Sequence, residues 1–186
     1  MAGVGYRHME LWRGIEIPTL KDIIPEPLLV LFVGLNPSPV SVAAGHYHQG
    51  HLGKRFWALL EAFGILPHPP ADAFHDDLLE ERGFGITDLA KLPTPRATGL
   101  TREDTELGRE ILMDKILRLR PRIVCPVYKS VLETLVGNKL PGFGSMRETI
   151  GESRLFALPF PYRPREQVER HMVEFTALVA EVATLA

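Results

Sequence analysis

Residues 28–37 read LLVLFVGLNP, an uninterrupted apolar run that ends in glycine, asparagine and proline. A strand that is apolar on both faces is typical of the centre of a parallel sheet with helices on each side. Working outward, three further segments are predicted strands, at 84–89, 123–127 and 154–158. Helices are predicted at 54–63, 104–120, 129–136 and 165–182. The alternation predicts a three-layer α/β/α fold with a central, mainly parallel, four-stranded sheet.

The length and composition limit the class of protein. The chain has 186 residues, 45% of them hydrophobic and 24% charged, which suits one domain with a substantial core. The formal net charge of −2 excludes a protein whose whole surface is a basic nucleic-acid clamp, but it allows a local basic face. The 16 glycines and 16 prolines indicate many shaped loops.

The single cysteine, Cys125, excludes an intrachain disulfide and any zinc site built on cysteines. No segment approaches the ~20 apolar residues that a membrane span needs. Residues 1–14 lack the hydrophobic core of a signal peptide. We therefore expect a soluble, cytoplasmic protein.

The segment 72–82 contains five carboxylates within ten residues. This composition predicts an acidic helix whose charges face solvent.

The end of the first strand is a candidate ligand site, because ligands of parallel α/β sheets bind beyond the carboxyl ends of the strands. Gly34 and Leu35 lead to Asn36 and Pro37, and the spacing fits neither the phosphate loop nor the dinucleotide fingerprint. An amide can accept a hydrogen bond from water and donate one to a substrate carbonyl. From spacing alone, Asn36 is either a turn former or a catalytic residue.

A second unusual loop carries three of the seven histidines, His46, His48 and His51. A metal site is one interpretation, since imidazole is a common ligand. Against it, no carboxylate lies between Glu26 and Glu61 to complete the ligand shell locally. A pocket of imidazole and phenol groups that suits a flat polar ring is the better interpretation, and histidines on a surface loop are the third.

A series of short motifs runs in order along the chain: Gly34-Leu35-Asn36-Pro37, Gly45-His46-Tyr47-His48, Arg55-Phe56-Trp57, Gly85-Ile86-Thr87-Asp88-Leu89, Pro93-Thr94, Gly108-Arg109, Lys115-Ile116, Lys129 and Leu158-Pro159. This ordered series resembles the mismatch-specific uracil/thymine-DNA glycosylase family over roughly residues 18 to 180. The resemblance implies an enzyme that flips uracil, or a related damaged base opposite guanine, out of duplex DNA. It further implies monofunctional hydrolysis of the N-glycosidic bond, without a metal or cofactor. We expect residues 18–186 to form the single catalytic domain and residues 1–17 to be an N-terminal extension.

The resemblance also implies roles for individual residues. Asn36 would orient the attacking water, and backbone N–H groups of its loop and of residues 46–48 would stabilise the leaving base. The implied base pocket consists of Gly34, Leu35, Ser41, His46, Tyr47, His48 and Asp88. Either Tyr47 or His48 would stack on the flipped ring: phenol chemistry favours Tyr47, whereas counting from Gly45 favours His48. Asp88 would accept the uracil N3–H, or alternatively cap its loop.

The fourth loop departs from the family pattern. Relatives carry His or Asn followed by Pro-Ser, whereas residues 160–164 of this chain read FPYRP. We expect the missing imidazole to shift the substrate range or to slow turnover. Tyr162 or Arg163 would fill the gap left by the flipped base, and a proline-rich turn is the alternative interpretation.

Contacts to DNA phosphates are expected from basic residues near the predicted strand ends, namely Lys54, Arg55, Lys91, Arg96, Lys129 and Arg165. The expected partner is double-stranded DNA with a mismatched or damaged base, bound by a monomer. Two alternatives remain. One is a catalytically weak module that binds lesions and recruits other repair factors, and the other is a histidine-dependent metal hydrolase.

Overall fold

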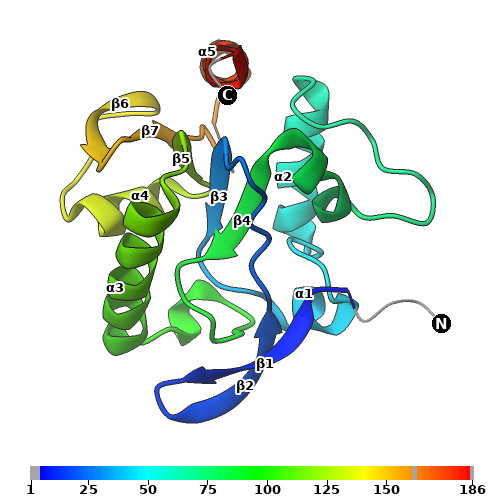
Figure 1. Ribbon diagram of the computed structural model, residues 1–186, viewed down its shortest axis with the longest axis vertical. Coiled ribbons are helices and arrows are strands. Elements are labelled where there is room, and N and C mark those ends of the chain that lie inside the picture. The colour runs from blue at the N-terminus through cyan, green and yellow to red at the C-terminus, as the bar shows by residue number, and fades with distance from the viewer. Residues whose placement is uncertain (1–4, 161–162, 185–186) are drawn as a thin grey trace.

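The computed structural model describes residues 5–160 and 163–184, and within them the centre of the molecule is a five-stranded sheet of order β4-β3-β5-β7-β6 (Figure 1). In chain order the elements are β1 (Arg7–Trp12), β2 (Ile15–Leu20), β3 (Val30–Gly34), α1 (Pro39–Ala44), α2 (His51–Ala62), η1 (His75–Leu78), η2 (Glu80–Arg82), β4 (Phe84–Asp88), η3 (Ala97–Gly99), α3 (Arg102–Leu119), β5 (Ile123–Pro126), α4 (Lys129–Val136), β6 (Gly144–Ile150), β7 (Ser153–Ala157) and α5 (Arg165–Thr184). The helices predicted at 54–63, 104–120, 129–136 and 165–182 are present, with ends shifted by up to three residues. None of the described helices is long and apolar enough to cross a membrane.

The central strand β3 pairs in parallel with β4 on one side and β5 on the other, and β5 pairs in parallel with β7. Every residue of β3 is buried, as expected for a strand covered on both faces. The mainly parallel sheet in three layers is thus confirmed, but the described chain has five strands in it rather than four. The missed strand, β6, pairs antiparallel with β7 at the edge. Its sequence GSMRETI is largely polar and exposed, so it carries no strand-like apolar pattern.

Helices α2 and α5 cover one face of the sheet, and α3 and α4 cover the other (Figure 1). Alternate side chains of β3 supply both cores, because successive side chains of a strand point to opposite faces. On the first face, the ring centroid of Phe32 lies 5.5 Å from that of Phe56 and 6.2 Å from that of Phe175. The second core includes Leu31, Val33, Leu112, Ile116, Val131 and Leu132. The apolar run at 28–34 therefore joins the two layers of helices.

Strands β1 and β2 form an antiparallel hairpin beside the main sheet. Trp12 is buried there, and its indole Nε1–H donates to Asp104 Oδ1 at 2.8 Å. Asp104 also accepts from the main-chain N–H of Thr101, whose hydroxyl caps α3. The hairpin thus packs against the start of α3 through a polar contact as well as apolar ones.

The acidic segment 72–82 does not form the predicted helix. It forms two short 3₁₀ turns, η1 and η2, and Asp76 between its acidic neighbours is fully buried. Asp76 accepts hydrogen bonds from the main-chain N–H of Tyr47 at 2.7 Å and from His46 Nδ1–H at 2.9 Å. Asp77 accepts from the N–H of Phe74 at 2.8 Å. The predicted helix is wrong, because Asp76 and Asp77 accept hydrogen bonds from the neighbouring loop and turn. The exposure of the carboxylates is as predicted for Asp72, Asp77, Glu80 and Glu81, whereas Asp76 is buried.

Candidate active site

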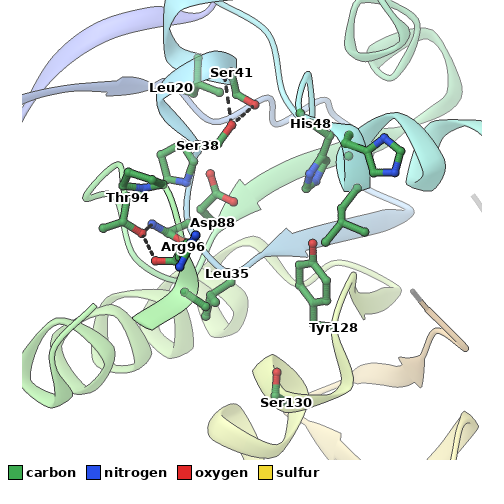
Figure 2. A pocket seen from close by; sticks show the side chains of 18 residues that line it. Leu20, Leu35, Ser38, Ser41, His48, Asp88, Thr94, Arg96, Tyr128 and Ser130 are labelled. Atoms are coloured by element: carbon green, nitrogen blue, oxygen red, sulfur yellow. Dashed lines mark hydrogen bonds between the residues drawn. The ribbon is translucent and has the colours of Figure 1, made fainter. Parts of the chain in front are cut away.

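A pocket of about 550 Å³ opens at the carboxyl ends of β3 and β4 (Figure 2). Its lining comes mainly from the loop after β3, the start of α1, the loop before α2 with the first turn of that helix, the end of β4 with the loop after it, and the segment after β5. The polar lining residues are Asn36, Ser38, Ser41, His48, His51, Asp88, Thr94, Arg96, Tyr128 and Ser130. This is the place where parallel α/β sheets bind their ligands.

Asn36 follows β3 directly, and its side chain is held by two hydrogen bonds. The Nδ2 group donates to the main-chain oxygen of Leu92 at 2.8 Å and to Thr94 Oγ1 at 2.7 Å. Thr94 Oγ1 in turn donates to the main-chain oxygen of Arg96 at 2.7 Å. Both amide hydrogens of Asn36 are therefore engaged, which leaves its Oδ1 to accept a hydrogen bond from a molecule in the pocket. The Pro93-Thr94 motif thus supplies the partner that orients Asn36.

Asp88 ends β4 and lies beside Gly34 of β3. A Cβ atom on Gly34 would lie 2.0 Å from Asp88 Oδ1, so only glycine allows this carboxyl group its place. Asp88 is 4% exposed, and its Oδ2 has no hydrogen-bond partner among the described residues. Burial raises the pKa of Asp88 to about 7, against the opposing effect of Lys91. A buried carboxyl oxygen without a partner is costly, so the pocket is suited to a polar ligand that meets it.

His48 lies on the opposite wall of the pocket, in a left-handed conformation with φ of 56° (Figure 2). Its ring centroid lies 4.9 Å from that of Phe56 and 5.7 Å from that of Trp57. A Cβ atom on Gly53 would lie 2.3 Å from the main-chain oxygen of His48, so the glycine allows the loop to rest on α2. Burial lowers the pKa of His48 to about 4, so the ring is neutral near pH 7, and its Nε2 has no partner among the described residues.

Residues 22–177 match the family model of the uracil DNA glycosylase superfamily. The chain belongs to this superfamily. It is also 30% identical over 144 residues to a G/U mismatch-specific uracil DNA glycosylase of Schizosaccharomyces pombe (strain 972 / ATCC 24843). That alignment covers 73% of this chain and 44% of the relative, so the chain spans less than half the length of that curated protein. The family predicted from the motifs is confirmed.

Two of the predicted base-pocket residues, Tyr47 and His46, do not line the pocket. Tyr47 is 1% exposed, its hydroxyl donates to the main-chain oxygen of Lys21 at 3.3 Å, and it is absent from the pocket lining. His46 is buried behind the loop, hydrogen-bonded to Asp76 and stacked on Phe74 with 3.7 Å between ring centroids. Both predictions are wrong because the left-handed backbone at His48 brings that ring to the pocket and leaves the two preceding side chains in the interior.

The three histidines of this loop do not converge on one point. Among the described residues, two groups of His and carboxylate side chains are close enough to share an ion. One is His46 with Asp76 and Asp77, and neither group includes His48 or His51. His46, His48 and His51 therefore do not form a joint metal site.

Lys91 is not available for a DNA phosphate. It is 5% exposed, and its Nζ donates to the main-chain oxygen of Leu20 at 2.9 Å and forms an ion pair with Asp22. Asp22 also pairs with Lys115, and these two lysines lower the pKa of Asp22 against the desolvation that raises it. The phosphate-contact prediction for Lys91 is wrong because the lysine neutralises a mostly buried carboxylate.

Of the other residues predicted to contact DNA phosphates, some lie at or near the pocket and others do not line it. Arg96 lines the pocket, and Lys54 and Arg55 are exposed on α2 just after its pocket-lining first turn. Arg165 is exposed and paired with Glu169. Lys129 is half-buried, with its Nζ 2.6 Å from the main-chain oxygen of Leu140 and 3.0 Å from Glu133.

The fourth loop is described in part. The guanidinium of Arg163 lies over the ring of Phe143, with its Cζ 4.6 Å from the ring centroid. Tyr162, the other predicted wedge residue, lies outside the described residues. Tyr128, which the motif analysis did not select, lines the pocket and lies 5.8 Å from the ring of Phe160. An aromatic residue directly after a predicted strand was the sequence feature that could have identified Tyr128.

Proposed function

We propose that this chain is a monofunctional DNA glycosylase that hydrolyses the N-glycosidic bond of uracil, or of a related deaminated base, opposite guanine. The superfamily match and the S. pombe relative's activity support the reaction class. The observation that carries the proposal is the convergence of Asn36 Oδ1, Asp88 Oδ2 and the ring of His48 on one pocket, where the two oxygens have no hydrogen-bond partner among the described residues. Two such oxygens and one aromatic ring, from three separate segments of the chain, suit a flat base with polar edges.

In this mechanism, the target nucleotide leaves the base stack, since the C1′–N1 bond is inaccessible inside a duplex. Asn36 Oδ1 accepts a hydrogen bond from the attacking water and directs its lone pair toward C1′. An amide is a poor base, so the bond to the base breaks largely before water attacks. The sugar then has oxocarbenium character and the base leaves as an anion, which takes up the proton that the water loses when its oxygen bonds to C1′. Main-chain N–H groups of the Asn36 loop stabilise that anion.

Asp88 supplies the recognition of the base edge. As a carboxylate it accepts the N3–H of uracil through the oxygen that otherwise lacks a partner. Such a hydrogen bond favours the charged form and lowers the pKa of Asp88 from about 7 when the base is bound. His48, held against Phe56 and Trp57, is the residue that stacks on the flipped ring.

On the DNA side, Arg96, Lys54 and Arg55 contact phosphates at the mouth of the pocket. Arg163 and Tyr162 remain the proposed wedge that fills the gap in the duplex. Because the fourth loop carries no imidazole to stabilise the leaving base, we expect slower turnover than an enzyme that has one. A module that binds lesions without cutting them is the alternative that this loop motivates.

The test uses labelled duplexes with G·U, A·U, G·T or G·hypoxanthine pairs, plus single-stranded uracil, followed by alkaline cleavage at abasic sites. We expect the fastest release from G·U and a loss of at least about 10²-fold for Asn36→Ala, since one positioned polar group is worth that much in catalysis. Asn138→Ala is the matched control, because Asn138 is exposed and outside the pocket. Tight lesion binding without release from any substrate would reject the enzyme in favour of the binding module.

A further inference from the structure

A second polar cluster lies outside the pocket, where the end of α2 meets the segment that leads to η1. It consists of Glu61, His68 and His75, whose ligand atoms all lie within 4.8 Å of one another. His68 Nδ1 is 3.2 Å from Glu61 Oε1, and His75 Nε2 contacts the same oxygen. Two imidazoles and one carboxylate are a donor set of three-ligand zinc sites, in which water takes the fourth position.

The surroundings hold these side chains in place. The ring of His75 stacks on buried Trp57 with 4° between the ring planes and 5.3 Å between centroids. Glu61 is anchored in the last turn of α2, and His68 lies within the proline-rich stretch 67–70. The side chain of His68 is 80% exposed, which leaves an entry path for an ion. Restricted ligands reduce the ordering cost of binding.

We propose that Glu61, His68 and His75 form a zinc-binding site that fixes the segment between α2 and η1 to the end of α2. Glu61 lies ten residues along α2 from His51, which lines the pocket. Ten residues of helix span about 15 Å, so the ion would take no part in base excision. Its role is structural.

The site is connected to the pocket through two contacts that both end on Tyr47. Asp76, next to His75, accepts the main-chain N–H of Tyr47, and Trp57, beneath His75, donates its Nε1–H to the main-chain oxygen of Tyr47. The next residue is His48 on the pocket wall. Zinc at this cluster is therefore expected to stabilise the loop that carries His48.

The other cluster of ligand-type residues is less suited to an ion. His46, Asp76 and Asp77 are also within reach of one another, but Asp76 accepts a hydrogen bond from a group outside the cluster, the main-chain N–H of Tyr47. An ion there would displace the contacts that hold the loop. We therefore assign zinc to Glu61, His68 and His75.

The test titrates ZnCl₂ into chelator-treated protein of residues 1–186, with calorimetry for stoichiometry and thermal unfolding for stability. We expect one ion per chain and a Tm that rises with zinc concentration. His68→Ala and Glu61→Gln should each weaken binding by more than about tenfold, since even outer-shell partners are worth about that much. Because His68 is exposed and glutamine matches glutamate in size, both variants are expected to fold. Acidification should weaken binding, since protons compete for imidazole.

His8→Ala and Asp77→Asn are the controls. His8 pairs with a single carboxylate, Glu10, and Asp77 belongs to the other cluster. Both should bind zinc as the unchanged protein does. Absence of binding, or binding that survives His68→Ala and Glu61→Gln, would overturn the proposal, and a loss confined to Asp77→Asn would move the ion to the other cluster. These readouts do not depend on glycosylase activity, so the two proposals fail separately.

Discussion

At the scale of single residues, the pocket is defined by polar atoms that have no hydrogen-bond partner within the described protein. Asp88 Oδ2 and His48 Nε2 are buried without partners in the described chain. Such groups reduce the stability of the folded protein, and a ligand that satisfies them recovers that free energy on binding. Asn36 differs, since Thr94 and Leu92 hold its amide group while its oxygen stays available.

Replacing Asp88 by asparagine should stabilise the protein above neutral pH. The folded-state pKa of about 7 lies above the ordinary value of 3.8, so between these values the folded state holds a proton that the unfolded state releases. Stability conferred by protonated Asp88 is therefore present at low pH and lost as pH rises toward 7. At pH 8 we expect Asp88→Asn to gain up to about 4 kcal/mol over the unchanged protein, and far less at pH 4, by urea denaturation.

Asp114→Asn is the control, because Asp114 is exposed on α3. Asp88→Asn should also remove the pH dependence of base excision, which we expect to rise with pH through about 7 as the carboxylate forms. A pH profile that Asp88→Asn leaves unchanged would contradict base recognition through this carboxyl group.

At the scale of elements, short turns and loops position the pocket. The 3₁₀ turn η1 places Asp76 beneath the loop at 45–49, where one carboxylate satisfies both a main-chain N–H and an imidazole. Strands β3 and β4 place Gly34 opposite Asp88, and the missing side chain makes room for the carboxyl group. The geometry of His48 and Asp88 thus depends on neighbours that do not line the pocket.

Replacing Asp76 by alanine should loosen the loop that carries His48. The variant leaves the N–H of Tyr47 and the Nδ1–H of His46 without their buried acceptor, at a cost of about 1–3 kcal/mol for each buried group. We expect lower stability in urea denaturation and weaker binding of a uracil-containing duplex. Asp72→Ala is the matched control, since Asp72 is exposed in the same segment. Equal stability of the two variants would contradict the role of Asp76.

At the scale of the whole molecule, a net charge of −2 is compatible with DNA binding because the charges are sorted by position. Arg96, Lys54 and Arg55 lie at or near the pocket mouth, whereas Lys91 and Lys115 neutralise Asp22 inside the protein. A residue count cannot separate the two sets. The proposed phosphate contacts are therefore fewer than the basic residues near the strand ends.

Arg96→Ala should change DNA binding without changing stability, whereas Lys91→Met should change stability without changing the salt slope of binding. For Arg96→Ala we expect weaker DNA binding and unchanged stability. The slope of log K against log salt concentration should become shallower by the amount of about one phosphate contact. For Lys91→Met we expect a loss of roughly 3 kcal/mol in stability with an unchanged salt slope, because the variant removes one partner of a largely buried ion pair. Fluorescence anisotropy at several salt concentrations measures the salt slope, and urea denaturation measures the stability, with Arg118→Ala on α3 as the control for both. A reduced slope for Lys91→Met would contradict its internal role.

The amino-acid sequence by itself determined the parallel α/β architecture and the position of the site at the strand ends. Apolar runs on two faces allow few other arrangements, and strand ends in a parallel sheet meet at one edge, which brings Asn36 and Asp88 together. Only the tertiary structure decided which loop side chains face the pocket. His48, rather than Tyr47, reaches it because one left-handed residue sets the direction of each side chain. Burial of Asp76 and Lys91 likewise depends on partners about 30 to 70 residues away in the sequence. The local sequence pattern around each residue does not indicate such contacts.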